Sequence, residues 1–227
     1  MTATSTTTYI HQRGIHCESA CQARILAASG HQIDEDVIFG LDGSFGFSFW
    51  PVKGNAPDVI VGKQSIMPLR ATRLLGVDVT MHAPKTSSGL AKLVDTHGPV
   101  MARVDLGLLP YWGMSGRSSF GGYFVNVVAA SDAGVDISDA ACDTVMTVDP
   151  QQLEEARSSR NSPPLNPDSK VYVFGAPHRM PNLKVVGPVA VRNMCRDVLK
   201  PGSRSLGIPG IKQLVKISPS WASSSAT

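Results

Sequence analysis

The stretch FGGYFVNVVAASDAGVDIS (residues 120–138) carries the strongest strand signal in the sequence. Its first part is rich in β-branched and aromatic residues, and its last part, VDIS (135–138), follows a short turn sequence, Asp-Ala-Gly at 132–134. Two such runs joined by a tight turn predict an antiparallel hairpin in the second half of the chain.

The residues before and after this hairpin predict mainly helices and short strands. A helix over Cys17–Ser29 has an apolar side rich in alanine, and Gly30 follows its end. The other expected elements are a short helix capped by Asp34, a loop or irregular strand over 40–49, short strands at 57–62, 77–82 and 99–105, and helices over 68–75, 87–97, 151–158 and 189–199. Helices followed by an antiparallel sheet predict an α+β fold. Papain-like cysteine enzymes share this order, but the pattern alone does not choose among α+β folds.

The composition excludes several functional classes. With 42% hydrophobic residues among 227, the chain can bury a core, so we do not expect disorder throughout. No apolar run approaches the roughly 18 residues of a membrane helix. The formal net charge of +3 comes without a Lys/Arg stripe interleaved with aromatics, so we do not expect nucleic-acid binding. The Gly-rich stretches lack the spacing of a phosphate-binding loop.

Cys17 is the first candidate for chemistry, because it lies at the predicted start of a helix, after Gly-Ile-His at 14–16. A helix N-terminus supplies partial positive charge and backbone N–H groups, which favour a thiolate and can hold an oxyanion. The alternative is a small buried residue in an alanine-rich helix, and position alone favours this alternative. Cys21 lies one turn later on the same face and is expected to pack, whereas Cys142 and Cys195 have no special setting.

Two further residues near these elements have an interpretable setting. His16 precedes Cys17 directly, and neighbours at a helix start point in different directions, so we expect a structural role for His16. Asp139 ends the second strand of the hairpin, where a carboxylate can orient a base on the neighbouring strand or cap the following turn. The sequence leaves both roles of Asp139 open.

Together these residues resemble the butirosin-biosynthesis protein H family. The stretch GIHCESACQARILAASGHQIDEDVIFGLDGSFGFSFWP (14–51) is similar to the family's opening, with its Gly-x-His-Cys-Glu motif and a Gly-rich aromatic segment. Four later stretches resemble the family in the same order: GPVMARVDLGLLPYW (98–112), FGGYFVNVVAA with VDISDAA (120–141), DPQQLEEARSS (149–159) and SLGIPGIKQLVKISPSW (205–221). The resemblance thus spans most of the chain.

The resemblance implies a papain-like, peptidase-C39-like fold, with the Cys-bearing helix packed on the late antiparallel sheet, and acyl chemistry in natural-product biosynthesis. The family's named member moves an aminoacyl group from the phosphopantetheine thioester of an acyl carrier protein onto an aminoglycoside amine. Cys17 corresponds to the nucleophile and Asp139 to the orienting carboxylate. Further residues implied to support the site or contact the substrate are His16, Glu18, Phe47, Trp50 and Gly122.

Two departures from the family pattern matter. Tyr123 stands where the family has a histidine after two glycines, and Ser118 and Ser119 stand near a missing loop histidine, so the Cys–His–Asp triad is incomplete. Tyrosine is a poor base near pH 7, but a phosphopantetheine thiolate needs less acid assistance to leave than an amine does. The replacement of this histidine by Tyr123 therefore suits thioester chemistry better than peptide hydrolysis. The sequence also stops soon after Trp221, whereas the family's C-terminal region continues further.

On this basis we expect four regions: a flexible leader (1–13), a papain-like catalytic-type domain (14–158), a linker (159–169) and a short C-terminal helical appendage (170–227). The leader lacks the basic start and apolar core of a secretory signal. The four cysteines form no CxxC pair and are too few for a disulfide scaffold. We therefore expect a cytoplasmic protein with reduced thiols and no bound metal.

The function expected from the sequence is a cysteine-dependent acyltransferase or cyclase that acts on a carrier-bound thioester, with Cys17, Tyr123 and Asp139 as catalytic residues. The expected partners are an acyl carrier protein and a small acyl acceptor, and a homodimer is left open. We expect no cofactor on this chain, because the phosphopantetheine arm belongs to the partner. One alternative is a weakened relative that only binds a carrier protein or a metabolite. Another is a bacteriocin-processing peptidase, which the missing histidine disfavours.

Overall fold

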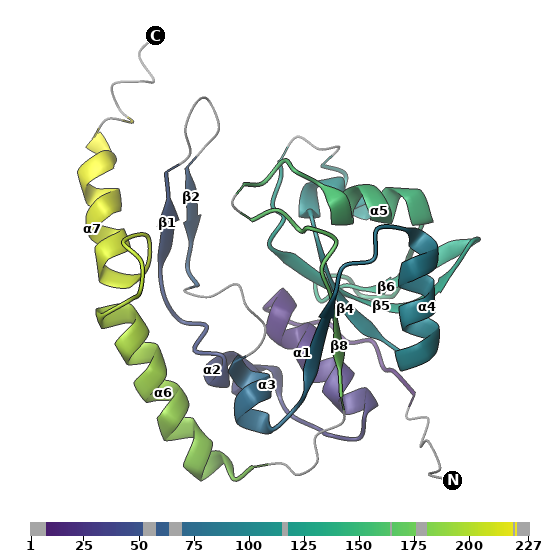
Figure 1. The fold of residues 1–227 in the computed structure, drawn as a ribbon, viewed down its shortest axis with the longest axis horizontal. Helices are drawn as coiled ribbons and strands as arrows, with labels where there is room; N and C mark the ends of the chain where they lie inside the picture. The colour runs from purple at the N-terminus through teal and green to yellow at the C-terminus, as the bar shows by residue number, and fades with distance from the viewer. Residues whose placement is uncertain are drawn as a thin grey trace. The chain divides into compact units, whose positions relative to one another are not determined.

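The computed structural model describes residues 8–51, 58–63, 70–114, 118–163, 165–175, 181–219 and 221. The chain divides into two compact units (Figure 1). Unit 1 comprises residues 1–38 and 76–179, and unit 2 comprises residues 39–75 and 180–227. Each unit is therefore built from two separate segments of the chain.

Unit 1 contains an antiparallel sheet with the order β3-β8-β4-β5-β6-β7 among the described residues. Its strands are β3 (Val79–His82), β4 (Val100–Val104), β5 (Tyr123–Ser131), β6 (Gly134–Ser138), β7 (Met146–Val148) and β8 (Val171–Phe174). The predicted hairpin is confirmed, since β5 pairs with β6 around the turn after Ser131, with a register shift between Val127 and Ala129. The α+β class predicted from the sequence is confirmed as well.

Helices of unit 1 cover both faces of this sheet: α1 (Cys17–Ala28), α4 (Ser87–His97) and α5 (Pro150–Ser158). Val125 of β5 shares a buried apolar cluster with Leu90 of α4 and Leu153 of α5. The next residue, Asn126, points to the opposite face, where its Nδ2 donates to the carbonyl oxygen of Cys21 in α1 at 2.9 Å. The alternation of side chains along β5 thus fixes α1 on one face of the sheet and α4 on the other.

Unit 2 joins an early segment to the end of the chain. Its elements are α2 (Glu35–Leu41), which begins in unit 1, β1 (Ser48–Trp50), β2 (Val59–Val61), α3 (Arg70–Leu75), α6 (Leu183–Leu199) and α7 (Gly207–Ile217). β1 pairs with β2. Gly207 N donates to the carbonyl oxygen of Phe47 at 2.8 Å, and Phe49 N donates to that of Ser205 at 2.7 Å. These bonds tie the start of α7 to β1.

The regions of the structure differ from the expected boundaries in three places. The expected appendage (170–227) begins with β8, which lies between β3 and β4 in the main sheet because it pairs with both. Part of the expected linker is buried, since Leu165 is 4% exposed and its carbonyl accepts a hydrogen bond from Arg103 at 2.7 Å. Tyr9, in the expected flexible leader, donates to Ser138 Oγ at 2.9 Å.

The last predicted helix, 189–199, begins six residues earlier than expected. The side chain of Asn182 accepts a hydrogen bond from Lys184 N at 2.9 Å and so caps α6 at Leu183. Pro188 was expected near the start and instead lies inside the helix. The prediction placed the start at the proline and overlooked the asparagine cap.

Candidate active site

Cys17 is the first residue of α1 and its side chain is half-buried. The Nδ1 atom of His16 caps the helix by accepting a hydrogen bond from Ser19 N at 3.3 Å. The carboxylate of Glu35 accepts hydrogen bonds from His16 N at 2.7 Å and from Ile15 N at 3.0 Å. His16 thus caps the start of α1, and Cys17 lies where the helix start supplies partial positive charge.

Asp139 follows β6, is fully buried, and collects hydrogen bonds from four donors. Its Oδ1 accepts from the Tyr123 hydroxyl at 2.7 Å and from Ala141 N at 3.0 Å. Its Oδ2 accepts from the Tyr111 hydroxyl at 3.0 Å and from Trp112 Nε1 at 3.3 Å. The carboxylate therefore holds the Tyr123 hydroxyl of the neighbouring strand and also binds the backbone of the following turn, as the second alternative predicted.

Tyr123, at the first position of β5, donates its hydroxyl proton to Asp139. Burial raises the pKa of Tyr123 well above its usual value, and the hydrogen bond to Asp139 and the charge of that carboxylate raise it further. Cys17 adds a smaller contribution in the same direction, so the two side chains are close enough to interact. Tyr123 is consequently a neutral phenol at pH 7, and its proton is directed at Asp139.

Tyr111 and Trp112 are site residues that the sequence analysis missed. They form the 3-10 turn η2 (Pro110–Trp112) in the loop after β4. The Trp112 ring meets the Tyr123 ring edge to face, with centroids 6.3 Å apart. Burial, the charge of Asp139 and the hydrogen bond to it raise the pKa of Tyr111 well above its usual value. The feature of the sequence that could have pointed to these two residues is an adjacent aromatic pair in a glycine-rich loop.

A second buried carboxylate, Asp105, closes the base of this loop. Its Oδ1 accepts from Gly107 N at 3.1 Å and from Phe120 N at 3.0 Å. Its Oδ2 accepts from the hydroxyls of Ser119 and of Ser159, the latter at 2.7 Å. The two ends of the loop that carries Tyr111 and Trp112 are thus bound to one fully buried side chain.

The other predicted site residues lie in different surroundings. Glu18 is buried in the first turn of α1, and Gly122 is buried directly before β5, where a Cβ would come within 2.9 Å of the Phe120 ring. Phe47 and Trp50 belong to unit 2, where they precede and end β1. Cys17, Tyr123 and Asp139 all belong to unit 1, where Tyr123 is hydrogen-bonded to Asp139.

The other cysteines match their expected packing or incidental roles. Cys21 is fully buried, and burial together with the charge of Cys17 raises the pKa of its thiol well above its usual value. Cys142 is half-buried and Cys195 exposed, and no disulfide joins the four cysteines, each of which lies within the described ranges. Over those same ranges, no group of three or more His, Cys, Asp or Glu side chains is placed to hold a metal ion.

The helices can also be compared with membrane spans. Among the described segments, none combines the length and the apolar character needed to cross a bilayer.

Comparisons with known proteins identify the family and the fold of the chain. The family model described as butirosin biosynthesis protein H, N-terminal, matches residues 16–140, more than half of the chain. A structure from Bacillus anthracis, described as a C39-like peptidase, is similar with a TM-score of 0.52 and 18% identity, covering 78% of this chain and 98% of that chain. The likeness at this identity shows the fold, which is C39-like.

A second similar structure is the peptidase domain of Streptococcus ComA, a bi-functional ABC transporter involved in a quorum-sensing pathway. Its TM-score is 0.48 at 14% identity, and the match covers 74% of this chain and 99% of that chain. No curated protein matches the chain.

Proposed function

Because the chain belongs to the butirosin biosynthesis protein H N-terminal family, we propose that it is a cysteine-dependent acyltransferase or cyclase of antibiotic-type biosynthesis. Its substrate is an acyl group held as a thioester on the phosphopantetheine arm of a carrier protein. The observation that carries the proposal is the half-buried Cys17 at the start of α1, beside the phenol that Asp139 holds.

In the first step the Cys17 sulfur attacks the carbonyl carbon of the carrier thioester. The bond from this carbon to the pantetheine sulfur breaks, and the acyl group is left on Cys17. The proton of the Cys17 thiol passes to the departing sulfur, so charge and atoms balance. The backbone N–H of Cys17, at the helix start, is placed to stabilise the oxyanion.

In the second step an amine, hydroxyl or carbon nucleophile of the acceptor attacks the acyl carbon. The bond to the Cys17 sulfur breaks, and the proton of the acceptor returns to that sulfur. Tyr123 cannot be the base, because its raised pKa keeps it protonated and its proton lies on the hydrogen bond to Asp139. The phenol oxygen can still accept a hydrogen bond from the attacking group and so orient it.

Unit 2 has the charge expected of a surface that receives an acidic carrier protein. Its acidic residues are confined to Asp42, Asp58 and Asp197. Its exposed basic residues on α6, α7 and the turn between them are Lys184, Arg192, Arg196, Lys200, Arg204, Lys212 and Lys216. This excess supports electrostatic steering of a negatively charged partner.

The test is intact-mass analysis after incubation with a small acyl thioester. We expect the mass to rise by one acyl group in the wild-type protein and in Cys195→Ala, which removes an exposed thiol unconnected with the site. We expect no adduct on Cys17→Ala. Wild-type protein that stays unmodified while product forms would exclude the covalent step.

A second candidate is a protein that binds a carrier protein or metabolite without turnover. The observation in its favour is Tyr123, a protonated phenol where the family has histidine. Tyr123→His separates the two candidates. An inert wild type together with a variant that hydrolyses thioesters favours the binding role. If the wild type is active and the variant is slower, Tyr123 has an adapted catalytic role.

A further inference from the structure

His11, in the segment before α1, bridges the two ends of the turn that follows β6. The Tyr9 hydroxyl donates to Ser138 Oγ at 2.9 Å, and His11 Nδ1 lies 2.7 Å from the same oxygen. His11 Nε2 lies 3.2 Å from the carbonyl oxygen of Cys142. Ser138 directly precedes Asp139, and Cys142 N donates to the carbonyl oxygen of Asp139 at 3.2 Å. His11 therefore holds the residues on both sides of the Asp139 turn.

These hydrogen bonds allow one arrangement of protons around His11. Asn126 Nδ2 donates to the Tyr9 hydroxyl oxygen at 2.9 Å, and Tyr9 gives its own proton to Ser138 Oγ. Because Ser138 is buried, its hydroxyl proton goes to His11 Nδ1, its remaining partner among the described residues. The ring proton of His11 then lies on Nε2 and is directed at the Cys142 carbonyl oxygen. The series of donors thus specifies the Nε2–H tautomer of His11.

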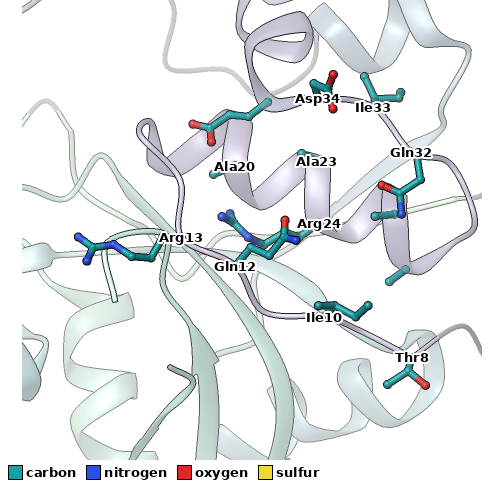
Figure 2. A pocket seen from close by; sticks show the side chains of 13 residues that line it. Thr8, Ile10, Gln12, Arg13, Ala20, Ala23, Arg24, Gln32, Ile33 and Asp34 are labelled. Atoms are coloured by element: carbon teal, nitrogen blue, oxygen red, sulfur yellow. The ribbon is translucent and has the colours of Figure 1, made fainter. Parts of the chain in front are cut away.

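Side chains of this segment alternate between two surroundings. Tyr9 and His11 point to the end of β6, whereas Thr8, Ile10 and Gln12 line a pocket beside α1. In Figure 2 the last three side chains extend from the segment that runs beside α1. A period of two is typical of an extended chain. The described part of the expected flexible leader therefore contacts both α1 and β6, and all of these elements belong to unit 1.

The same segment ties the turn to the start of α1. Gly14 N donates to the carbonyl oxygen of Ala140, the residue after Asp139, at 2.8 Å. Cys17 follows Gly14 by three residues, so the turn is linked to the helix that carries the proposed nucleophile. A shift of the turn would move the Asp139 carboxylate, and with it the Tyr123 hydroxyl that is bonded to this carboxylate at 2.7 Å.

We propose that His11 is a positioning residue of the acyl-transfer reaction. By bridging Ser138 and Cys142 it fixes the turn that orients Asp139, and through Asp139 it fixes the phenol of Tyr123. The bridge needs an acceptor and a donor on one rigid side chain, and a neutral imidazole supplies both. This role rests on the proposed function and adds to it a residue that acts on the reaction only through the turn.

The first measurement is independent of activity. Nitrogen NMR of the full chain labelled at histidine distinguishes a ring nitrogen that carries a proton from one that does not. In mildly alkaline buffer we expect the His11 signals, assigned by their absence in His11→Gln, to show a protonated Nε2 and an unprotonated Nδ1. The opposite tautomer, or the averaged signals of a free side chain, would overturn the proposal.

The second measurement separates the two steps of the reaction by single-turnover kinetics. His11→Ala should leave formation of the acyl-enzyme on Cys17 nearly unchanged and slow transfer to the acceptor by roughly three- to tenfold, because only the orientation of Tyr123 is loosened. His11→Gln should recover most of the transfer rate, since an amide also offers one acceptor and one donor. Arg13→Ala is the matched control from the same segment, because it removes only an exposed ion pair with Asp143 and should change neither step.

His11→Ala added to Tyr123→Phe should cause no further loss, because the effect of His11 passes through that phenol. Additive losses, equal losses in His11→Gln and His11→Ala, or equal slowing of both steps would each overturn the proposal. The nitrogen signals of the wild type remain decisive if His11→Ala fails to fold. A wild type that never forms an acyl-enzyme overturns the proposed function itself and the role of His11 with it, whereas an acyl-enzyme without the expected split between the steps overturns only the role of His11.

Discussion

The Tyr123 hydroxyl donates to Oδ1 of Asp139 over 2.7 Å, and this bond decides which chemistry the phenol can perform. A phenol has a single proton. Since that proton is directed at the carboxylate, the oxygen can present only lone pairs toward Cys17 and a bound acceptor. Tyr123 is thus an orienting acceptor in the proposed reaction, in contrast to the proton shuttle that a histidine would provide.

Tyr123→Phe should leave formation of the acyl-enzyme nearly unchanged and slow the transfer to the acceptor by roughly ten- to a hundredfold, because only the orientation of the attacking group is lost. Single-turnover kinetics with rapid quenching and mass detection separate the two steps. Tyr111→Phe is the matched control, since it removes a hydrogen bond to the same carboxylate from a residue of the turn η2 and leaves the Tyr123 hydroxyl in place. Equal losses in both variants would mean that Tyr123 acts only by holding Asp139.

All four tyrosines have a raised pKa, so the stability of the protein should fall above pH 10. Above that pH the unfolded chain loses tyrosine protons that the folded protein keeps, and each such tyrosine costs about 1.4 kcal/mol per pH unit. Burial raises the pKa of Tyr9 to about 12, so its contribution to this loss ends near that pH. Below pH 10 these groups contribute no pH dependence.

Tyrosinate absorbance and far-ultraviolet circular dichroism, recorded together against pH, measure this effect. We expect little tyrosinate until the helical signal is lost, and then a coincident change of both signals. A gradual rise of tyrosinate near pH 10 in a protein that keeps its helical signal would contradict the buried setting of the tyrosines.

The basic surface of unit 2 can be tested by charge reversal. Arg192→Glu combined with Lys212→Glu should raise KM for a carrier-bound substrate by about tenfold and leave the rate with a small thioester unchanged, because only the encounter with the acidic partner is affected. Added salt should lower the carrier-dependent rate of the wild type in the same way. Lys92→Glu, at an exposed position of α4 in unit 1, is the control. A similar rise of KM in the control would argue against docking on unit 2.

Asp105→Asn should destabilise the protein by roughly 2–4 kcal/mol, because a buried acceptor of four hydrogen bonds loses its charge and one of its acceptor oxygens. Urea denaturation measures the change in unfolding free energy. Asp143→Asn is the control, since its side chain is 80% exposed and its ion pair with Arg13 should contribute less than about 1 kcal/mol. A loss at Asp105 no larger than at Asp143 would show that the loop is held by other contacts.

Elements with strong local signals were predicted closely. The helix over 87–97 was predicted with the bounds of α4, since Thr86 caps its start and Gly98 follows its end. The strand β8 was missed, because a four-residue strand next to a Pro-rich segment has too short a pattern to recognise, and its pairing with β3 and β4 depends on residues far away in the sequence. The helix α7 was missed as well, because its glycines and proline resemble a loop.

In the candidate site, too, positions that depend on neighbouring residues could be predicted, and contacts between residues far apart in the sequence could not. The position of Cys17 at a helix start and of Asp139 at a strand end could be predicted, since both follow from the chain next to them. The hydrogen bonds from Tyr111 and Trp112 to Asp139 could not be predicted, because each of them joins residues that lie 27 or more positions apart in the sequence. The burial of Arg24, which is 7% exposed, likewise appears only once the chain is folded.

The place of β8 has a practical consequence for anyone who shortens this protein. β8 comes from residues 171–174, yet within the main sheet it is the strand that links β3 to β4. A fragment that stops after α5 would leave both of these strands with bare hydrogen-bonding edges, and exposed edges of this kind promote aggregation. Expression of unit 1 in soluble form should therefore require a truncation point beyond Phe174, however well the earlier residues account for the chemistry.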